Sequence, residues 1–323
     1  MHVEEAVEMP VKAQEHQAYE RLIAANEELP AARTIVAHPC DGPSLQGALD
    51  AMDGGIIEPV LVGPKARILA AAEEIGRSLE GIEIVNTEHS HASAEKAVDL
   101  IRQGAGVFLM KGSLHSDEIL GAVTNRTTGL RTERRISHVF AMAVPTYDQP
   151  LMITDAAVNL FPDLDDKRDI VQNVIDLALA LNLDPKVAIL SAVETVTSKL
   201  PSTIDAAALC KMADRGQITG GKLDGPLAFD NAISPEAARI KGIVSPVAGQ
   251  ANILVVPDLE AGNMLAKNLT FLGNADAAGI VLGARVPIVL TSRADTPRAR
   301  MASCAVAALF AEHQQRHQPI AGS

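Results

Sequence analysis

The sequence predicts an α/β fold in two domains, and three observations lead to that prediction. Short apolar runs rich in β-branched residues alternate with helical segments along most of the chain. With 323 residues, the chain is longer than one typical hydrophobic core supports. Aromatic residues make up only 2% of the chain and Trp is absent. The cores must therefore consist of aliphatic side chains, which suits parallel strands covered by helices on both faces.

The first third of the chain alternates strictly between strand and helix, which predicts a parallel sheet. Ser44 is expected to cap the helix that follows the first strand. The predicted strands are residues 34–38, 59–62, 82–85 and 107–110. The predicted helices are residues 13–27, the helix capped by Ser44, residues 66–75, residues 93–103, and one that begins near Asp117.

The pattern changes after Arg134, which predicts a domain boundary near Val144. Two apolar runs, residues 136–144 and 151–155, are joined by a short loop bounded by proline, as in an antiparallel pair. Alternation then resumes, with a helix capped by Ser202 and a turn at residues 220–226. The remaining predicted elements are helices at 166–180, 235–241 and 260–272 and strands at 187–190 and 253–256.

The segment of residues 285–300 predicts an anion-binding junction. A buried strand at residues 286–290 leads into a five-residue loop, and a helix begins at Thr296 and Pro297. The N–H groups at a helix N-terminus attract anions, Ser292 adds a hydroxyl, and Arg293 adds a fork that can hold two phosphate oxygens. The alternative interpretation is an ordinary junction in which Arg293 pairs with Asp295 at the surface.

Charge and cysteine content narrow the classes of partner and compartment. The net charge is −12 and no basic block is present, which disfavours nucleic acid and anionic membranes. No apolar run is long enough to span a bilayer, and the acidic first residues do not resemble a signal peptide. Three widely spaced cysteines without a CxxC motif indicate a reducing compartment, so a cytoplasmic location is expected.

Polar residues next to the predicted strands are the candidates for ligand binding. In open α/β sheets, ligands bind beyond the carboxyl ends of strands, where hydroxyl, amide and cationic groups suit a phosphate. The chain has no GxGxxG, no P-loop and no HExxH motif, so neither a nucleotide cofactor nor a metal is predicted. The candidate substrate-binding residues are Lys111, Ser113, His115, Ser245, Gly249, Asn252 and Asn263.

Four stretches together resemble the phosphate acetyltransferase and phosphate butyryltransferase family. The likeness extends from about Thr34 to the last helix, and the wording of GLRT…RRISHV and LTSRAD resembles the butyryl branch more than the acetyl branch. The matching strings are KGSLHSDEILGAVTNRTTGLRTERRISH (residues 111–138), DGPLAFDNA (224–232), SPVAGQANILVVPDLEAGN (245–263) and VPIVLTSRAD (286–295).

The resemblance implies a fold of the isocitrate and isopropylmalate dehydrogenase type, with parallel and mixed sheets and an inter-domain cleft. It implies a discontinuous first domain, residues 1–144 plus 287–323, and a second domain of residues 145–286. It also implies a homodimer that transfers a short acyl group, acetyl or butyryl, between coenzyme A and inorganic phosphate without a cofactor. The catalytic residues carried over are Ser292 and Arg293, with Asp295 as a nearby acid.

Two positions depart from the family pattern and keep other functions open. Gly121 stands where many relatives have an arginine, for which Arg126 or Lys111 is the available substitute. Ala299 stands where acetyl-branch members have an aspartate, proposed there as the base for the thiol. One alternative is therefore a degenerate member that binds acyl-CoA or phosphate without turnover. The other is a decarboxylating 2-hydroxy-acid dehydrogenase of the same fold, which would use acids such as Asp224, Asp230 and Asp258. Acyl chain length and the identity of the base do not follow from the sequence.

Overall fold

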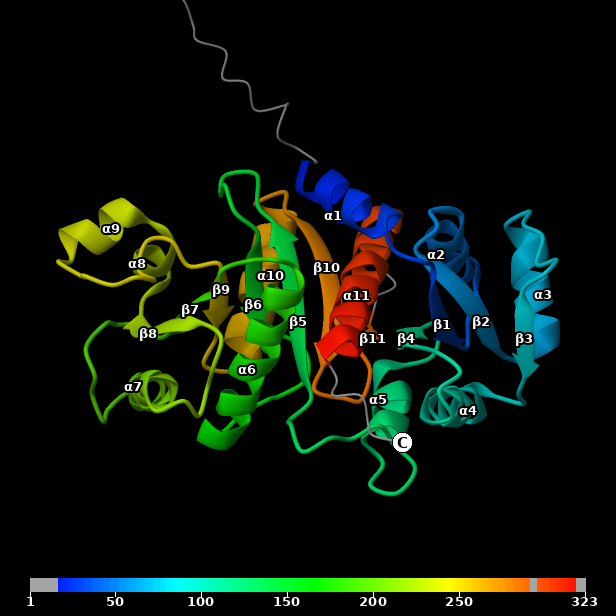
Figure 1. The fold of residues 1–323 in the computed structure, drawn as a ribbon, viewed down its shortest axis with the longest axis horizontal. Coiled ribbons are helices and arrows are strands. Elements are labelled where there is room, and N and C mark those ends of the chain that lie inside the picture. Colours follow the sequence, from blue (N-terminus) through cyan, green and yellow to red (C-terminus); the bar gives the residue numbers. More distant parts are fainter. Residues whose placement is uncertain (1–16, 291–294, 318–323) are drawn as a thin grey trace, which may run out of the picture.

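One mixed sheet of eleven strands runs through the protein, and helices cover both of its faces (Figure 1). The structure is a computed structural model and describes residues 17–290 and 295–317. The strand order is β3-β2-β1-β4-β11-β10-β5-β6-β9-β7-β8. The strands are β1 (Ala32–Ala37), β2 (Ile57–Gly63), β3 (Glu83–Asn86), β4 (Phe108–Lys111), β5 (Ser137–Ala143), β6 (Leu151–Thr154), β7 (Lys186–Leu190), β8 (Lys222–Leu227), β9 (Ile253–Val255), β10 (Asp276–Leu282) and β11 (Ile288–Val289).

The helices form two layers. Figure 1 shows α6 and α11 on the near side of the sheet and α10 on the far side. The helices are α1 (Gln17–Glu27), α2 (Gly42–Asp53), α3 (Lys65–Glu74), α4 (Ser90–Arg102), α5 (Ser116–Thr124), α6 (Leu164–Ala180), α7 (Pro201–Asp214), α8 (Phe229–Ile233), α9 (Pro235–Ile240), α10 (Leu259–Phe271) and α11 (Pro297–His317).

Three apolar clusters fill the space between the sheet and the helices. The first lies on the near face, where α2, α3, α6, α7 and α11 pack, and it extends along most of the sheet. The far face carries two separate clusters, one under α4 and α5 and another under α8 and α10. The far face therefore has a boundary between its two clusters, and the near face has none.

Two central strands reverse the direction of the sheet. Strands β1, β2, β3, β4 and β11 are parallel to one another, as are β6, β7, β8 and β9. Between these groups, β10 is antiparallel to β11, and β5 is antiparallel to both β10 and β6. Three reversals separate β4 from β6, so the carboxyl ends of the two parallel groups lie at opposite edges of the sheet.

The structure confirms the predicted mixed α/β architecture, the parallel strands of the first third, and the antiparallel pair that begins near residue 136. Two strands were missed: β10 was not predicted at all, and β8 was taken for a turn. Two caps were placed wrongly. Asp41, not Ser44, caps α2, because its carboxylate accepts the N–H of Ser44. Ser202 lies inside α7, which begins at Pro201.

Candidate active site

The carboxyl end of β4 is tied closely to the end of β1. The Ser113 hydroxyl donates to the carbonyl of His38 over 2.9 Å and accepts the N–H of Cys40 over 3.3 Å. A Cβ on Gly112 would lie 2.5 Å from the carbonyl oxygens of Ala37 and His38, so only glycine fits there. Ser113 therefore fixes the loop after β1, and its hydroxyl is already engaged.

Lys111 lies on the far face of the sheet at the end of β4. Only 7% of the residue is exposed, and its Nζ donates to the carbonyl of Gly112 over 3.2 Å. The next strand positions along the same row of the far face are Leu290, Gly279 and Phe140, as the strand registers indicate. Lys111 thus supplies a positive charge beside the strand that leads to residues 291–294.

His38, the first residue after β1, forms a buried polar network with Ser93 and Thr87. Its backbone has a φ of 58°, in the left-handed region that residues other than glycine rarely adopt. Its Nδ1 lies 2.8 Å from the hydroxyl of Ser93, which in turn lies 2.8 Å from the hydroxyl of Thr87. Burial, and then the charge of Arg67, lower the pKa of His38. His38 was not predicted from the sequence, because a single histidine at a strand end carries no motif.

His115 is exposed at the N-terminus of α5, where its backbone N–H donates to the carboxylate of Glu118 over 2.8 Å. Glu118 also accepts the hydroxyl of Ser90 and pairs with His91 at 2.9 Å. Burial acts to raise the pKa of Glu118, but these hydrogen bonds outweigh it and the pKa is lowered. The carboxylate is therefore held ionised between α4 and α5.

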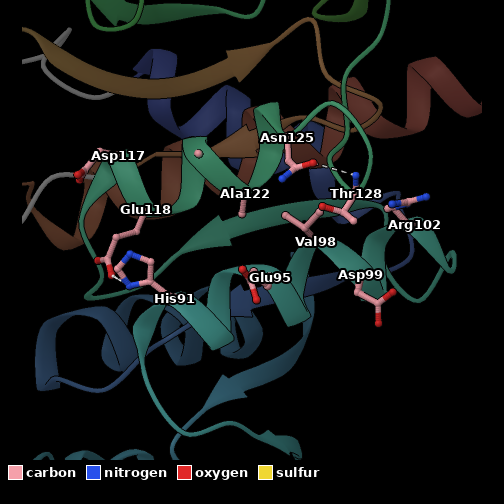
Figure 2. Close-up of a pocket in the computed structure, with 11 residues that line it drawn as sticks. His91, Glu95, Val98, Asp99, Arg102, Asp117, Glu118, Ala122, Asn125 and Thr128 are labelled. Atoms are coloured by element: carbon pink, nitrogen blue, oxygen red, sulfur yellow. Dashed lines mark hydrogen bonds and ion pairs between the residues drawn. The ribbon is translucent and has the colours of Figure 1, made fainter.

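A groove of about 570 Å³ lies between α4 and α5, next to this carboxylate. Figure 2 shows His91 and Glu95 from α4 facing Glu118 from α5. Gly121 lines the groove, and no atom lies within 4 Å of the place where its Cβ would be. Gly121, where the family resemblance led us to expect an arginine, thus opens into this groove. None of the seven candidate substrate-binding residues lines it.

The segment before β9 mainly supports neighbouring elements. Ser245 accepts the N–H groups of Val247 and Ala248. Gly249 has a φ of 79°, and a Cβ there would lie 2.6 Å from the Cα of Pro235. Asn252 accepts the N–H of Lys186 over 2.8 Å and donates to the carbonyl of Asp184 over 2.9 Å, so it joins the starts of β9 and β7. These residues lie at the edge where β4 ends, but four other strands separate β9 from β4.

Asn263 lies near the other edge of the sheet, after β6. Its side chain donates to the carbonyl of Ala156 over 3.1 Å. At the preceding residue of α10, a Cβ on Gly262 would lie 2.7 Å from the carbonyl oxygen of Asp155. The close approach of α10 to the loop after β6 explains the glycine and the asparagine in this string. The structure thus groups Lys111 and Ser113 but separates them from Asn263.

Ser292 and Arg293 lie outside the residues that the structure describes. The two ends of their loop are described: β11 ends at Val289, and α11 begins at Pro297. Thr296 caps α11 as predicted, because its hydroxyl accepts the N–H of Ala299 over 3.1 Å. Asp295 is partly exposed just before this cap, and Ala299 lies in the first turn. The predicted strand and the predicted helix on the two sides of residues 291–294 are therefore present.

His138 is a further candidate, although it was quoted from the sequence only as part of a string. It lies on β5, is 2% exposed, and faces the same side of the sheet as Lys111. Among the described residues, its Nδ1 has no hydrogen-bond partner. Burial lowers its pKa to about 4, although the nearby charge of Asp155 acts to raise it. Its neutral form is therefore the relevant one at neutral pH.

Other chemistries find little support within residues 17–290 and 295–317. Burial raises the pKa of Cys40 to about 11 and those of Cys210 and Cys304 to about 12, so their thiols stay protonated. This part of the chain holds no group of three or more His, Cys, Asp or Glu side chains arranged for a metal. Nor does it hold a helix that is both long and apolar enough to cross a membrane.

The sequence comparisons identify the family of this α/β protein. The sequence model for "phosphate acetyl/butaryl transferase" matches residues 91–308. The chain belongs to this family, and the protein is an acyltransferase. A phosphate acetyltransferase from Rhizobium meliloti is 67% identical over 304 residues, which cover 94% of this chain and 96% of the relative. A phosphate butyryltransferase from Clostridium acetobutylicum is 43% identical over 280 residues, which cover 86% of this chain and 93% of the relative.

The solved structures agree with this assignment. A branched-chain phosphotransacylase from Enterococcus faecalis V583 is 29% identical, covers 87% of this chain and 99% of its own, and gives a TM-score of 0.76. Local wording suggested the butyryl branch, whereas the identity to the acetyltransferase exceeds the identity to the butyryltransferase.

Proposed function

We propose that the protein transfers an acetyl group reversibly between coenzyme A and inorganic phosphate. The observation that carries the proposal is the 67% identity to a phosphate acetyltransferase along 94% of the chain. The choice of acetyl over butyryl rests on the lower identity, 43%, to the butyryltransferase. Coenzyme A is a substrate in this scheme, and no further cofactor is needed.

The reaction requires three functions from the protein. A phosphate oxygen attacks the thioester carbon, the C–S bond breaks, and the sulfur leaves as a thiolate that takes up a proton. The protein must hold the phosphate, stabilise negative charge on the carbonyl oxygen, and let the proton move. Because the substrate supplies its own thiol, no protein nucleophile is needed, which fits the three protonated cysteines.

We assign the phosphate to the junction between β11 and α11. In this assignment Arg293 binds it through two parallel N–H groups, and Ser292 stabilises the leaving thiolate. Lys111, at the end of the adjacent strand β4, adds a positive charge on that side. Asp295 stands in for the aspartate that Ala299 replaces. Ser113, His115, Ser245, Gly249, Asn252 and Asn263 remain proposed substrate-binding residues, with the neighbouring contacts described above.

A coupled assay tests the proposal. Free thiol released from acetyl-CoA on addition of phosphate is measured, with butyryl-CoA in parallel. We expect phosphate-dependent release, with acetyl-CoA preferred by kcat/KM. Absence of phosphate-dependent release with either thioester would refute the function. Binding of acyl-CoA without turnover would instead indicate the degenerate member considered above.

The first prediction concerns Arg293. Arg293→Ala should raise the KM for phosphate by about 10- to 100-fold, because a charge-assisted bidentate contact is lost. Arg293→Lys should recover only part of this loss, since a lysine keeps the charge but not the fork. Steady-state kinetics with varied phosphate measures both variants.

Arg285→Ala is the matched control for this prediction, because Arg285 is an exposed arginine just before β11. Its phosphate KM should match that of the wild type. An Arg293→Ala enzyme that is folded and has an unchanged phosphate KM would contradict the assignment.

The dehydrogenase alternative has little to support it. Asp258 caps α10, Asp224 accepts the N–H of Gly225, and Asp230 lies in α8. Each of these aspartates therefore has an ordinary place in an element or a turn. Reduction of a nicotinamide dinucleotide with a 2-hydroxy acid and Mg²⁺ would revive this alternative.

We also propose that residues 1–144 with 287–323 and residues 145–286 act as two domains around a cleft, and that the protein is a cytoplasmic homodimer. The separate clusters on the far face support a cleft there. Sedimentation equilibrium with and without coenzyme A tests the dimer.

A further inference from the structure

The His138 ring occupies a place that neighbouring residues prepare for it. A Cβ on Gly279 would lie 3.1 Å from its Nε2, so the glycine on β10 makes room for the ring. Phe140 lies on β5, as His138 does, and its ring packs edge to face against the His138 ring, with the two ring centroids 4.4 Å apart. The backbone of β5 is fixed here as well, because the hydroxyl of Thr154 donates to the carbonyl of His138 over 2.8 Å.

This place is the boundary between the two apolar clusters of the far face. Ile136, two residues before His138, belongs to the cluster under α4 and α5. Phe140, two residues after it, packs against the cluster under α8 and α10. His138 lies between these two residues on β5. A polar side chain at this boundary is costly for packing alone, which suggests another use.

The ring also lies close to the strand that carries the proposed phosphate site. The Cβ position of Gly279 is 3.1 Å from Nε2 of His138 and 3.7 Å from the carbonyl oxygen of Leu290. Nε2 of His138 and the carbonyl oxygen of Leu290 thus each lie within 4 Å of the Cβ position of Gly279. Leu290 is two residues before Ser292 in the sequence.

The ring has an unused hydrogen-bonding nitrogen. Nδ1 is buried and has no partner among the described residues. Asp155, the ionisable group whose charge acts on the ring, is occupied elsewhere: its carboxylate accepts N–H groups of Ala157, Val158 and Asn159. An imidazole that stays neutral can carry its proton on Nδ1 and donate it in a hydrogen bond.

We propose that the Nδ1–H of His138 donates a hydrogen bond to the carbonyl oxygen of the acyl group and stabilises the negative charge that develops there. The inference rests on the proposed acyl transfer. An unpartnered buried donor gains its partner only when the substrate arrives, so the interaction is strongest in the transition state. A neutral imidazole suits this role, because its donor strength does not change between pH 6 and 8.

Three substitutions test the proposal by their kinetics and melting temperatures. His138→Leu removes the donor and should lower kcat by about 100-fold, with the KM for phosphate changed less than threefold. His138→Asn places an amide N–H near the position of Nδ1 and should recover at least tenfold of that loss. His138→Gln places its amide nearer the position of Nε2 and should recover less.

The matched control is Thr154→Val, which removes a hydrogen bond to the backbone of His138 and leaves the ring in place. It should lower the melting temperature without changing kcat. The pH profile gives a second readout: a donor predicts that the wild type and His138→Asn share the same profile between pH 6 and 8. A proton-accepting role predicts that the acidic limb changes in His138→Asn.

Three results would overturn the inference. One is a folded His138→Leu enzyme with kcat within threefold of the wild type. Another is equal activity of the asparagine and leucine variants, and the third is an altered pH profile in His138→Asn. If His138→Leu does not fold, the comparison of His138→Asn with His138→Gln tests the inference instead. Equal kcat values of these two variants would reject a donor at Nδ1. A wild-type enzyme without phosphate-dependent thiol release would refute the proposed function instead.

Discussion

His138 has a consequence for stability that is separate from catalysis. Its pKa is about 4 in the folded protein, against 6.5 for an ordinary histidine. Above pH 6.5 the ring is neutral in both states and the pH has no effect through this residue. As the pH falls from 6.5 towards 4, the unfolded chain binds a proton that the folded protein does not, so stability is lost.

The prediction at this scale is a loss of about 2 kcal/mol of unfolding free energy between pH 7 and pH 5 through His138. Urea unfolding of the wild type and of His138→Asn at both pH values measures it, because the difference between the two proteins isolates this residue. An equal pH dependence of both proteins would show that the ring is accessible to protons in the folded state.

Single residues also explain why the candidate site was only partly predictable. Thr296 was recognised as a cap, because its chemistry depends on a local pattern. Asn252 and Ser113 were nominated as ligand-binding groups, yet each joins two strands that are far apart in sequence. Such long-range partners leave no trace in a sequence window, so a polar residue that supports the fold resembles one that binds a ligand.

At the scale of elements, α6 and α7 are joined by an ion pair with unequal exposure. Nζ of Lys167 lies 2.6 Å from Oδ2 of Asp205, and their side chains are 7% and 26% exposed. If Asp205 is removed, a nearly buried ammonium group is left unpaired. If Lys167 is removed, water can still reach the carboxylate. The two deletions should therefore differ in cost.

Asp205→Ala should lower the unfolding free energy by about 3 kcal/mol, and Lys167→Met by about 1 kcal/mol. Lys211→Ala is the control, because it breaks an exposed pair with Asp214 on the same helix and should leave the unfolding free energy almost unchanged. Urea titrations of the three variants give these values. A larger loss for Lys167→Met than for Asp205→Ala would contradict the argument from burial.

The missed strands have physical reasons. The β10 sequence begins DAAG, whose small residues and acid resemble a loop, and its neighbours on both sides fix it as a strand. The β8 sequence contains Gly225-Pro226, which normally marks a turn. Without β10, the reversal of direction in the middle of the sheet could not be predicted. For that reason the sequence could not show that the carboxyl ends of β4 and β6 lie at opposite edges of the sheet.

At the scale of the whole molecule, the continuous sheet argues against independent unfolding of its two halves. The near-face cluster includes side chains from Val36 to Phe310. Strand β10, which falls within residues 145–286, has β5 and β11 as its neighbours, and both lie outside that segment. Cutting the chain at residues 144 and 286 would expose both edges of β10.

We therefore predict one cooperative unfolding transition in calorimetry, with calorimetric and van't Hoff enthalpies in agreement. The isolated fragment of residues 145–286 should show no cooperative transition, since β10 has lost both partners. Two separate transitions in the intact protein, or a cooperatively folded fragment, would indicate independent domains.

The position of β11 between β4 and β10 has a consequence for synthesis on the ribosome. When residue 111 has emerged, β4 can pair with β1, but its other edge remains open until residues 288–289 follow. During that interval the nascent chain presents an unpaired apolar strand, which is the kind of edge that recruits other chains. The open edge of β4 is thus closed by β11, a strand made about 175 residues later than β4.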